Sequence, residues 1–356
     1  MPGIPVGLIG FGAAARVFHA PVIRAVAGLE LSAILQRRGD SAAEAYPDVQ
    51  VFRDLDEMLA ASPARLMVVA TPNASHYDLA RRCLLAGRDV VVDKPFTPTS
   101  EEARALVQLA SSTGRRLSVF QNRRWDGDFL TVRRLIEAGT LGRVVLIESH
   151  FDRFRPGRRA ASWRESEGVG SGLLFDIGPH LLDQALVLFG QPEALTADVR
   201  LERGDAVVDD AFDISLHYSG LRVLLRATML ACSPGPRFIL QGDRGTFRKH
   251  GLDPQENALK EGGRPGSPGW GEEDESKWGT LSLPGEDGSV TCRSIRTEPG
   301  DYRQFYANVR DAILGAAPLA VPASDGLRVI RLLELARESN RLRRTVDCAG
   351  QLHREE

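Results

Sequence analysis

The chain has 356 residues, of which 43% are hydrophobic and 26% are charged, a composition that excludes a largely disordered protein. Lys and Arg (45) nearly balance Asp and Glu (47), giving a formal net charge of −2. This balance argues against a binder of nucleic acid or of membrane surfaces, because such proteins rely on clustered positive charge.

The first part of the chain, residues 1–121, alternates between apolar runs and helical patterns. The predicted strands are Ile4–Ile9, Leu31–Leu35, Leu66–Ala70, Val90–Val92 and Leu117–Phe120. The predicted helices between them are Arg16–Val26, Asp54–Ala60, Ser75–Ala86 and Ser100–Ser112. Continuous apolar runs are typical of strands buried on both faces of a parallel sheet. We therefore predict a doubly wound α/β domain over residues 1–121.

The pattern changes in residues 122–356, where we predict a second domain. Its predicted helices are Phe129–Ala138, about Asp176 to Phe189, Tyr302–Leu314 and Asp325–Leu342. Its predicted strands are Val144–His150, Phe212–Tyr218, Leu221–Thr228 and Phe238–Gln241. Short strands separated by turn residues favour a mostly antiparallel sheet with one covered face. Residues 251–289 are rich in Gly, Pro, Glu and Asp, and we expect them to be the least structured part.

A glycine-rich loop follows the first predicted strand. It reads Gly10-Phe11-Gly12-Ala13-Ala14-Ala15, which is the dinucleotide-binding fingerprint G-x-G-x-x-G with Ala in the third position. The first glycine permits a tight turn, the second lets the backbone approach a pyrophosphate, and the following helix offers amide donors. The loop therefore predicts a bound nucleotide.

Two arginines, Arg37 and Arg38, follow the second predicted strand. An NAD site usually has an acid there that binds the ribose 2′-hydroxyl, but the first acid in this segment is Asp40. Guanidinium groups suit a 2′-phosphate instead, so we predict NADP, with NAD as the alternative cofactor. A solvated surface loop is the competing interpretation of the two arginines.

Three further residues carry side chains suited to alcohol and ketone chemistry. Lys94 comes at the carboxyl end of a predicted buried strand, where ligands bind in α/β sheets. Asp176 and His180 are four residues apart, so on a helix they share one face. A lysine can polarise an alcohol or carbonyl, and a histidine can carry its proton. Lys94 and His180 have structural alternatives, as a surface lysine before a proline and as a structural helix histidine.

The cysteines and histidines give no sign of a metal site or a disulfide framework. The four cysteines Cys83, Cys232, Cys292 and Cys348 have no C-x-x-C spacing, and the seven histidines are dispersed. No basic residue precedes Arg16, as a secretory signal would require, and no apolar stretch approaches the length of a membrane span. We predict a cytoplasmic protein without a metal and without contact to a membrane or nucleic acid.

Several motifs together resemble one family, the Gfo/Idh/MocA oxidoreductases. These motifs are the glycine loop, Thr71-Pro72-Asn73-x-x-His76, Asp93-Lys94-Pro95 and Asp176-x-Gly178-x-His180. Further stretches are similar to the NADP-dependent scyllo-inositol dehydrogenase branch of that family. They are residues 120–126, 153–156, 162–164 and 251–259. The resemblance covers nearly the whole chain.

The resemblance implies a Rossmann domain followed by an α/β domain with a large open sheet, through which the chain would form homodimers or homotetramers. It implies that Lys94, Asp176 and His180 are catalytic, and that the Lys94–Pro95 bond is cis. The cofactor-binding residues that we expect are Gly10, Phe11, Gly12, Ala13, Ala14, Arg37, Arg38, Thr71, Pro72, Asn73, His76, Asp93, Lys94 and Asn122. The family usually has Glu where this chain has Asp93, which is one methylene shorter.

The hypothesis that follows is hydride transfer between nicotinamide C4 and a ring carbinol of a cyclic polyol or sugar. His180 takes the hydroxyl proton, Lys94 stabilises the alkoxide, and Asp176 orients His180 or binds a neighbouring hydroxyl. Polyols need directional donors and an aromatic wall, which a polar-aromatic set supplies. That set is Asn122, Arg123, Arg124, Trp125, Arg153, Arg155, Trp163 and Arg164. The expected substrate-binding residues are Lys94, Asn122, Arg124, Arg153, Trp163, Arg164, Asp176 and His180.

Other functions stay open at this point. The same fold could act on an aldose, an anhydro-sugar or a diol, and fold analogy does not separate these substrates. It could also serve as a non-catalytic NADP-binding sensor or co-regulator, although the three polar groups Lys94, Asp176 and His180 argue against that class. Some of the polar-aromatic set could instead cover the open sheet or lie at a subunit contact.

Overall fold

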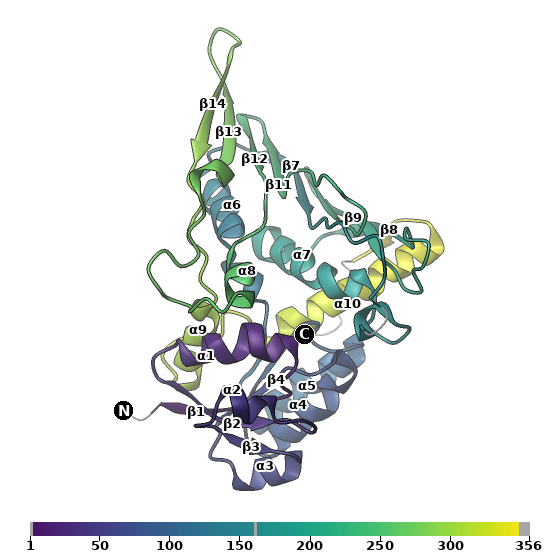
Figure 1. Cartoon of the computed structure of the whole chain (residues 1–356). Coiled ribbons are helices and arrows are strands. Elements are labelled where there is room, and N and C mark those ends of the chain that lie inside the picture. Colours follow the sequence, from purple (N-terminus) through teal and green to yellow (C-terminus); the bar gives the residue numbers. More distant parts are fainter. Residues whose placement is uncertain (1–2, 160–161, 349–356) are drawn as a thin grey trace. The chain divides into compact units, whose positions relative to one another are not determined.

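The computed structural model describes residues 3–159 and 162–348, and these divide into two compact units (Figure 1). The first unit contains the described residues up to Trp125 together with Pro254–Trp270 and Asp301–Ile330. The second contains Asp126–Asp253, Gly271–Gly300 and the described residues from Arg331 onward, apart from the undescribed pair 160–161. The first unit thus takes in two late segments, which the sequence pattern assigned to the second domain.

Among the described residues of the first unit, six strands form a parallel sheet in the order β3-β2-β1-β4-β5-β6. The strands are β1 (Ile4–Ile9), β2 (Leu29–Leu35), β3 (Gln50–Phe52), β4 (Leu66–Val69), β5 (Asp89–Val92) and β6 (Leu117–Val119). The helices are α1 (Ala20–Arg24), α2 (Ser41–Ala45), α3 (Leu55–Ala61), α4 (His76–Leu85), α5 (Ser100–Thr113), α8 (Gln255–Lys260) and α9 (Arg303–Ile313). β4 and β5 are buried along their whole lengths, as the continuous apolar runs predicted. The predicted doubly wound sheet is confirmed.

The helix after the glycine loop begins earlier than predicted and contains a wide turn. Helical backbone starts at Ala13, passes through a π-helical turn over Ala15–His19 and continues as α1. Such turns widen a helix locally and are frequent at functional sites. Here the turn contains His19, whose side chain is completely buried although its neighbour Arg16 is exposed.

Among the described residues of the second unit, nine strands form a mixed sheet in the order β14-β13-β12-β11-β7-β10-β9-β8-β15. The strands are β7 (Val144–His150), β8 (Ala194–Arg200), β9 (Ala211–Tyr218), β10 (Leu221–Thr228), β11 (Phe238–Gly242), β12 (Gly245–Lys249), β13 (Gly279–Pro284), β14 (Val290–Ile295) and β15 (Val346–Asp347). Only β7 and β10 pair in parallel among these described strands; the other pairs are antiparallel. The predicted mostly antiparallel sheet is confirmed.

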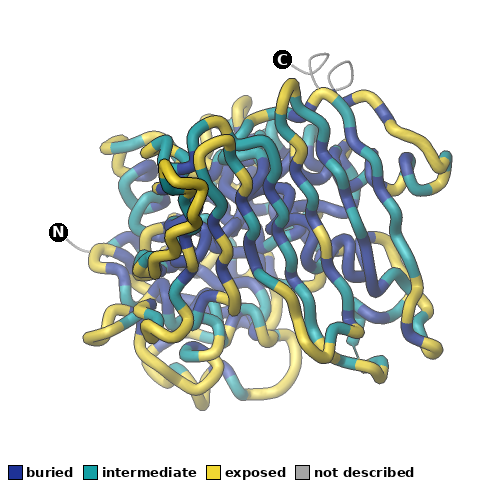
Figure 2. The backbone as a smooth tube through the Cα atoms, turned by 90° about the horizontal axis from the view of Figure 1, so that it is seen from above, coloured by how far each residue is buried: buried dark blue, intermediate teal, exposed yellow. Residues whose placement is uncertain are grey.

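One face of this sheet carries the core and the other does not. Along β10, Val223, Leu225 and Ala227 are buried, whereas Arg222, which precedes them, and Arg226 are exposed. In Figure 2, buried and less buried residues alternate along several strands of this sheet. Helix α7 (Leu173–Phe189) packs against β9 and β10. Helices α6 (Gly127–Glu137) and α10 (Ala323–Leu342) complete the helices of the described chain. Alternating burial of this kind is typical of an antiparallel sheet with one covered face.

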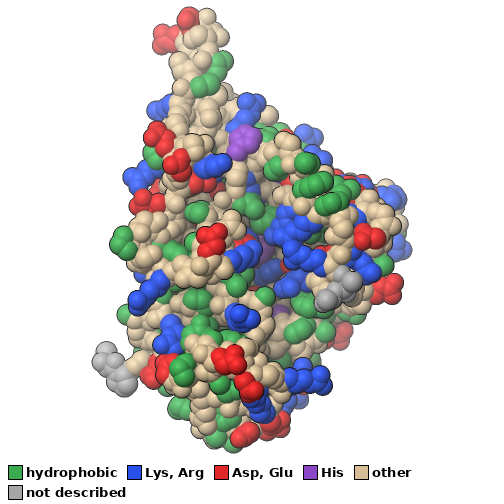
Figure 3. Space-filling view, in the orientation of Figure 1, with side chains coloured by type: hydrophobic (Ala, Val, Ile, Leu, Met, Phe, Trp, Pro, Cys, Tyr) green, Lys and Arg blue, Asp and Glu red, His purple; other side chains and the backbone are tan. Residues whose placement is uncertain are grey.

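The prediction that residues 251–289 form the least structured part is wrong at α8 and β13. These two elements lie within that range, and β14 follows as the second strand of a hairpin (Figure 1). Strand β14 is almost entirely exposed, so it lacks the alternation of apolar and polar residues by which strands are found. Acidic side chains gather at the tip of the hairpin, where Glu286 and Asp287 join the two strands (Figure 3).

Helix α7 receives its N-terminal cap from a distant segment of the second unit. Gly172, just before the helix, has a φ of +91° and gives no side-chain cap. The Asp209 carboxylate instead accepts the N–H of Leu174 at 2.6 Å, and the Asp209 carbonyl accepts the N–H of Leu173 at 2.7 Å. Burial raises the pKa of Asp209 although the Leu174 N–H and the charge of Arg337 act in the opposite direction.

We expect Gly172→Ala to destabilise the protein by roughly 1–3 kcal/mol, because a Cβ would strain the left-handed backbone. That Cβ would also lie 2.2 Å from Asp209 Oδ1. Gly168→Ala is the matched control, because a Cβ there meets nothing within 4 Å. Urea unfolding followed by tryptophan fluorescence measures both variants, and equal losses of stability would contradict the expected clash.

Candidate active site

The glycine loop has the geometry of a backbone cradle. Gly10 has a φ of +93°, and a Cβ on it would lie 2.8 Å from the carbonyl oxygen of Ala70, so only glycine fits without strain. A Cβ on Gly12 would meet nothing within 4 Å, and Gly12 and Ala13 are exposed. The Gly10 N–H donates to the Leu35 carbonyl at 3.0 Å, which joins the loop to β2. The open backbone at the start of the helix fits a dinucleotide pyrophosphate.

The two arginines after β2 lie in an exposed loop and border a pocket of about 460 Å³. Their loop is held by neighbouring polar groups. The Gln36 amide donates to the Arg38 carbonyl at 2.9 Å, and Arg53 donates to the Gln36 carbonyl at 2.8 Å. Asp40 forms an ion pair with Arg53. These contacts therefore hold the backbone of the loop after β2 that carries Arg37 and Arg38.

The segment after β4 brings Thr71, Pro72 and Asn73 into a short turn before α4. His76, the first residue of α4, is buried, and its two ring nitrogens face backbone carbonyls. Nε2 lies 2.9 Å from the Thr71 oxygen, and Nδ1 lies 2.9 Å from the Pro95 oxygen. Burial lowers the pKa of His76 although Asp93 and these carbonyls act in the opposite direction. In the structure His76 thus connects the segments that follow β4 and β5.

Lys94 follows directly on a buried carboxylate at the end of β5. The Lys94 N–H donates to Asp93 Oδ1 at 2.8 Å. Burial alone would raise the pKa of Asp93, but the contact with His19 and the charges of His19, Lys94 and His76 outweigh it and lower the pKa. The Lys94–Pro95 peptide bond is cis, as the resemblance implied.

Four residues of the polar-aromatic set follow β6 in a short 3₁₀ helix, Asn122–Trp125. Asn122 is buried, with 5% of its surface exposed. Arg124 donates to the Ala320 carbonyl at 2.7 Å and forms an ion pair with Asp325 at 2.8 Å. Arg123 forms an ion pair with Glu256. Both guanidiniums therefore have partners within the first unit, and the substrate contact predicted for Arg124 stays a prediction.

In the second unit, α7 brings together the predicted acid and base. Asp176 and His180 lie one turn apart in its N-terminal half, as their spacing predicted. Arg164 Nε lies 3.2 Å from Asp176 Oδ1, and the Arg164 guanidinium stacks over the Trp163 ring at 4.7 Å. The segment Trp163–Arg164 therefore lies beside the start of α7.

The loop that carries Trp163 and Arg164 is fixed by a buried arginine that sequence reasoning missed. Arg203 Nη1 lies 3.1 Å from Glu165 Oε2, and its Nε lies 2.8 Å from Asp210 Oδ2. Arg203 also donates to the Gly157 carbonyl at 3.2 Å. Arg153 in the same region stacks over Phe151 at 4.8 Å. No local pattern signals Arg203, because two of its partners, Glu165 and Gly157, are 38 and 46 positions away in the chain.

Sequence reasoning also missed His19 and Tyr306 in the first unit. His19 Nδ1 lies 2.6 Å from the Tyr306 hydroxyl, and Nε2 lies 3.7 Å from Asp93 Oδ1. The sign of His19 in the sequence was a histidine among apolar residues directly after the glycine loop.

Across the described residues, no group of three His, Cys, Asp or Glu side chains could hold a metal ion. No helix in residues 3–159 and 162–348 is long and apolar enough to cross a membrane.

Comparisons with known proteins agree with this organisation. Residues 4–121 match the GFO_IDH_MocA model, described as "Oxidoreductase family, NAD-binding Rossmann fold". Residues 133–348 match the GFO_IDH_MocA_C model, described as "Oxidoreductase family, C-terminal alpha/beta domain".

Relatives of similar length also match. The uncharacterized oxidoreductase YdgJ of Escherichia coli (strain K12) is 45% identical over 97% of this chain and 99% of its own. The scyllo-inositol 2-dehydrogenase (NADP(+)) IolW of Bacillus subtilis (strain 168) is 36% identical over 96% of this chain and 95% of its own. A solved structure of the oxidoreductase yvaA from Bacillus subtilis superposes with a TM-score of 0.93, at 36% identity, covering 97% of this chain and 98% of that one.

Proposed function

The chain belongs to the Gfo/Idh/MocA oxidoreductase family, and from this membership we propose that it is an NADP-preferring dehydrogenase or reductase acting on a ring CH–OH group of a cyclic polyol or sugar. The observation that carries the proposal is the ion pair between Arg164, in the loop before α7, and Asp176, on the helix that also carries His180. The acid and the imidazole lie one turn apart on α7, and a charged donor from the preceding loop contacts the acid.

The first unit supplies the residues that would hold the cofactor, which when bound donates or accepts a hydride at nicotinamide C4. The exposed backbone of Gly12 and Ala13 would bind the pyrophosphate. Arg37 and Arg38 would bind a 2′-phosphate in bidentate fashion, and the pocket beside them supports this assignment. Further proposed cofactor-binding residues are Thr71, Pro72, Asn73, Asp93, Lys94 and Asn122. His76 holds the two turns on which several of these residues lie.

The chain's own side chains would carry the proton chemistry. In the oxidation direction, His180 accepts the proton of the substrate hydroxyl. Lys94 stabilises the developing alkoxide through its positive charge. Asp176 holds Arg164 and orients His180 or a neighbouring hydroxyl. In the reduction direction the same groups return the proton to the carbonyl oxygen.

A scyllo-inositol-like polyol is the substrate that we propose first. The name of the relative IolW supports this class. The Trp163 ring offers an aromatic wall for C–H groups, and Arg164 and Arg153 offer directional donors, as a polyol requires. An aldose, an anhydro-sugar or a diol is the alternative.

Two assays test the proposal. One measures NADPH oxidation with inosose and ketose substrates, and the other measures NADP reduction with inositols and sugars. Nucleotide binding without turnover of any substrate would favour a sensor.

We expect His180→Ala to lower the turnover number about 10²–10⁴-fold, which is the contribution of a positioned general base. NADPH binding, measured by fluorescence titration, is expected to stay unchanged because His180 belongs to the second unit. His250→Gln, at an exposed histidine of the same unit, is the control. Full activity of His180→Ala would refute the assignment of the base.

We expect Arg38→Ala to raise the Michaelis constant for NADPH roughly 10-fold or more, with little change for NADH. The reason is that a charge-assisted hydrogen bond to the 2′-phosphate is lost, and NADH has no such phosphate. Arg81→Ala, at an exposed arginine of α4, controls for the loss of surface charge. Equal increases for the two cofactors would show that Arg38 does not select the phosphate.

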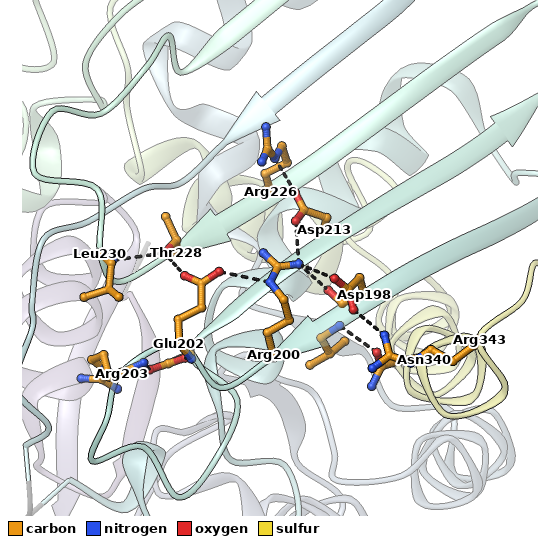
Figure 4. A network of polar contacts seen from close by, with 12 residues as sticks. Asp198, Arg200, Glu202, Arg203, Asp213, Arg226, Thr228, Leu230, Asn340 and Arg343 are labelled. Carbon is orange, nitrogen blue, oxygen red and sulfur yellow. Dashed lines mark hydrogen bonds and ion pairs between the residues drawn. The ribbon is translucent and has the colours of Figure 1, made fainter.

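We further propose that the open face of the nine-stranded sheet joins copies of the chain into homodimers or homotetramers. This face carries a network of three arginines and three acids on β8, β9 and β10 and on the segments that follow β8 and α10 (Figure 4). Its members are Asp198, Arg200, Glu202, Asp213, Arg226 and Arg343. Arg200 is its centre, 2.8 Å from Asp198 Oδ2 and 2.7 Å from Asp213 Oδ2. Paired charges of this kind can be covered without leaving an ion unpaired.

Arg200→Glu is expected to shift the oligomer toward smaller species, because it places four like charges together on that face. Multi-angle light scattering measures the change, and Arg133→Glu on the exposed side of α6 is the control. A monomeric wild-type protein at micromolar concentration would overturn this proposal.

We also propose a cytoplasmic location. None of the four cysteines, all within the described residues, forms a disulfide, and Cys232 and Cys292 are exposed. Exposed free thiols persist in reducing compartments.

A further inference from the structure

Three buried polar side chains of the first unit lie together beside Lys94. His19 and Tyr306 are completely buried, and Asp93 is 8% exposed. They come from the π-helical turn before α1, from α9 and from the end of β5, and α1 packs against α9 (Figure 1). The proposed reaction uses none of these side chains except Asp93.

His19 lies between the other two residues. Its Nδ1 is 2.6 Å from the Tyr306 hydroxyl, and its Nε2 is 3.7 Å from Asp93 Oδ1. The imidazole ring packs against Phe120 with 4.3 Å between ring centroids. Nδ1 therefore shares a hydrogen bond with Tyr306, whereas Nε2 faces the Asp93 carboxylate at ion-pair distance, beyond hydrogen-bond range, and an aromatic neighbour packs against the ring. This arrangement determines which nitrogen faces the carboxylate.

Asp93 passes the contact on to the backbone of Lys94. The same oxygen that faces His19, Oδ1, accepts the Lys94 N–H at 2.8 Å. A movement of this carboxylate would therefore change the position of the lysine backbone.

We propose that His19, oriented by the Tyr306 hydroxyl, is a positioning residue that holds the Asp93 carboxylate against the backbone of Lys94 and so aligns the lysine with the substrate oxygen. This inference rests on the proposed function only in the last step, the action of Lys94 on substrate. The contact between His19 and Asp93 is independent of the reaction.

The electrostatics of the cluster support the proposal. The charged or titratable groups that face Asp93 are His19 before α1, Lys94 after β5, His76 of α4 and Tyr306 of α9. Burial opposes the charge of Asp93, and the contact with His19 is the largest influence that favours it and lowers its pKa. Burial also raises the pKa of Tyr306 well above its ordinary value, so its hydroxyl keeps its proton.

The first experiment measures the pH dependence of kcat/KM for His19→Leu in the reduction direction, in which His180 acts in its protonated form and therefore does not set the acid limb. Without His19, less remains to counter the effect of burial, so the pKa of Asp93 rises. The acid limb of the pH profile, where activity falls as Asp93 is protonated, therefore moves to higher pH by about one unit. At the optimum, kcat falls up to about 100-fold while the dissociation constant of NADPH stays unchanged. His19→Gln, which keeps an N–H donor in the side chain, is expected to recover part of the loss. His217→Leu, at a histidine of β9 that contacts Thr196, leaves the acid limb in place.

The second experiment needs no substrate and therefore separates this inference from the proposed function. The free energy of unfolding is measured against pH for wild type, His19→Leu, Asp93→Asn and the double variant. We expect the two losses to be non-additive at neutral pH, because the residues interact. The folded pKa of Asp93 lies below its unfolded value of about 3.9, so the coupling persists above that pH and fades as the pH falls below it.

Tyr306→Phe keeps the test decisive if His19→Leu does not fold, because it removes only the hydroxyl. It is expected to move the acid limb in the same direction by a smaller amount. Additive stability losses over the whole pH range, or an acid limb that neither His19→Leu nor Tyr306→Phe moves, would overturn the inference. Coupling without turnover of any substrate would support the positioning of Asp93 and refute only the proposed reaction.

Discussion

A buried carboxylate is the constraint on which the candidate site of the first unit depends. Removing a carboxylate from water is unfavourable unless hydrogen bonds and opposite charge compensate. At Asp93 the compensation comes from the Lys94 N–H and from His19, and the resulting contacts fix the backbone where β5 ends. His76 binds the same turn through the Pro95 carbonyl. The lysine therefore projects from a backbone that is held by buried side chains on two sides.

The second unit uses a buried arginine for a comparable purpose. Arg203 is 6% exposed and lies between the carboxylates of Glu165 and Asp210. A buried ion is stable only when its partners satisfy it fully, and these contacts fix the loop residues beside Glu165. Arg164, the preceding residue, contacts Asp176. In both units, a candidate reactive group thus lies next to a segment that a buried charge holds in place.

The sequence predicted those parts of the site that depend on local patterns. Gly10, the end of β5 and the spacing of Asp176 and His180 follow from short motifs and from helical periodicity, and the structure has them in the predicted elements. It did not predict the buried partners. His19 and Tyr306 are 287 positions apart, and no periodicity links residues at that separation. Short β3 and exposed β14 were missed because neither carries a continuous or alternating apolar run.

These long-range partners change what counts as the nucleotide-binding part of the chain. The family model for the Rossmann fold ends at residue 121, yet the first unit also contains Asp301–Ile330. That late segment contributes the Tyr306 hydroxyl to His19 and the Val321 carbonyl to Ser118, at 2.6 and 2.7 Å. Both contacts are buried, and buried polar groups without partners are strongly unfavourable. The unit that would bind the cofactor therefore obtains some of its buried polar partners from a segment that follows much of the second unit in the chain.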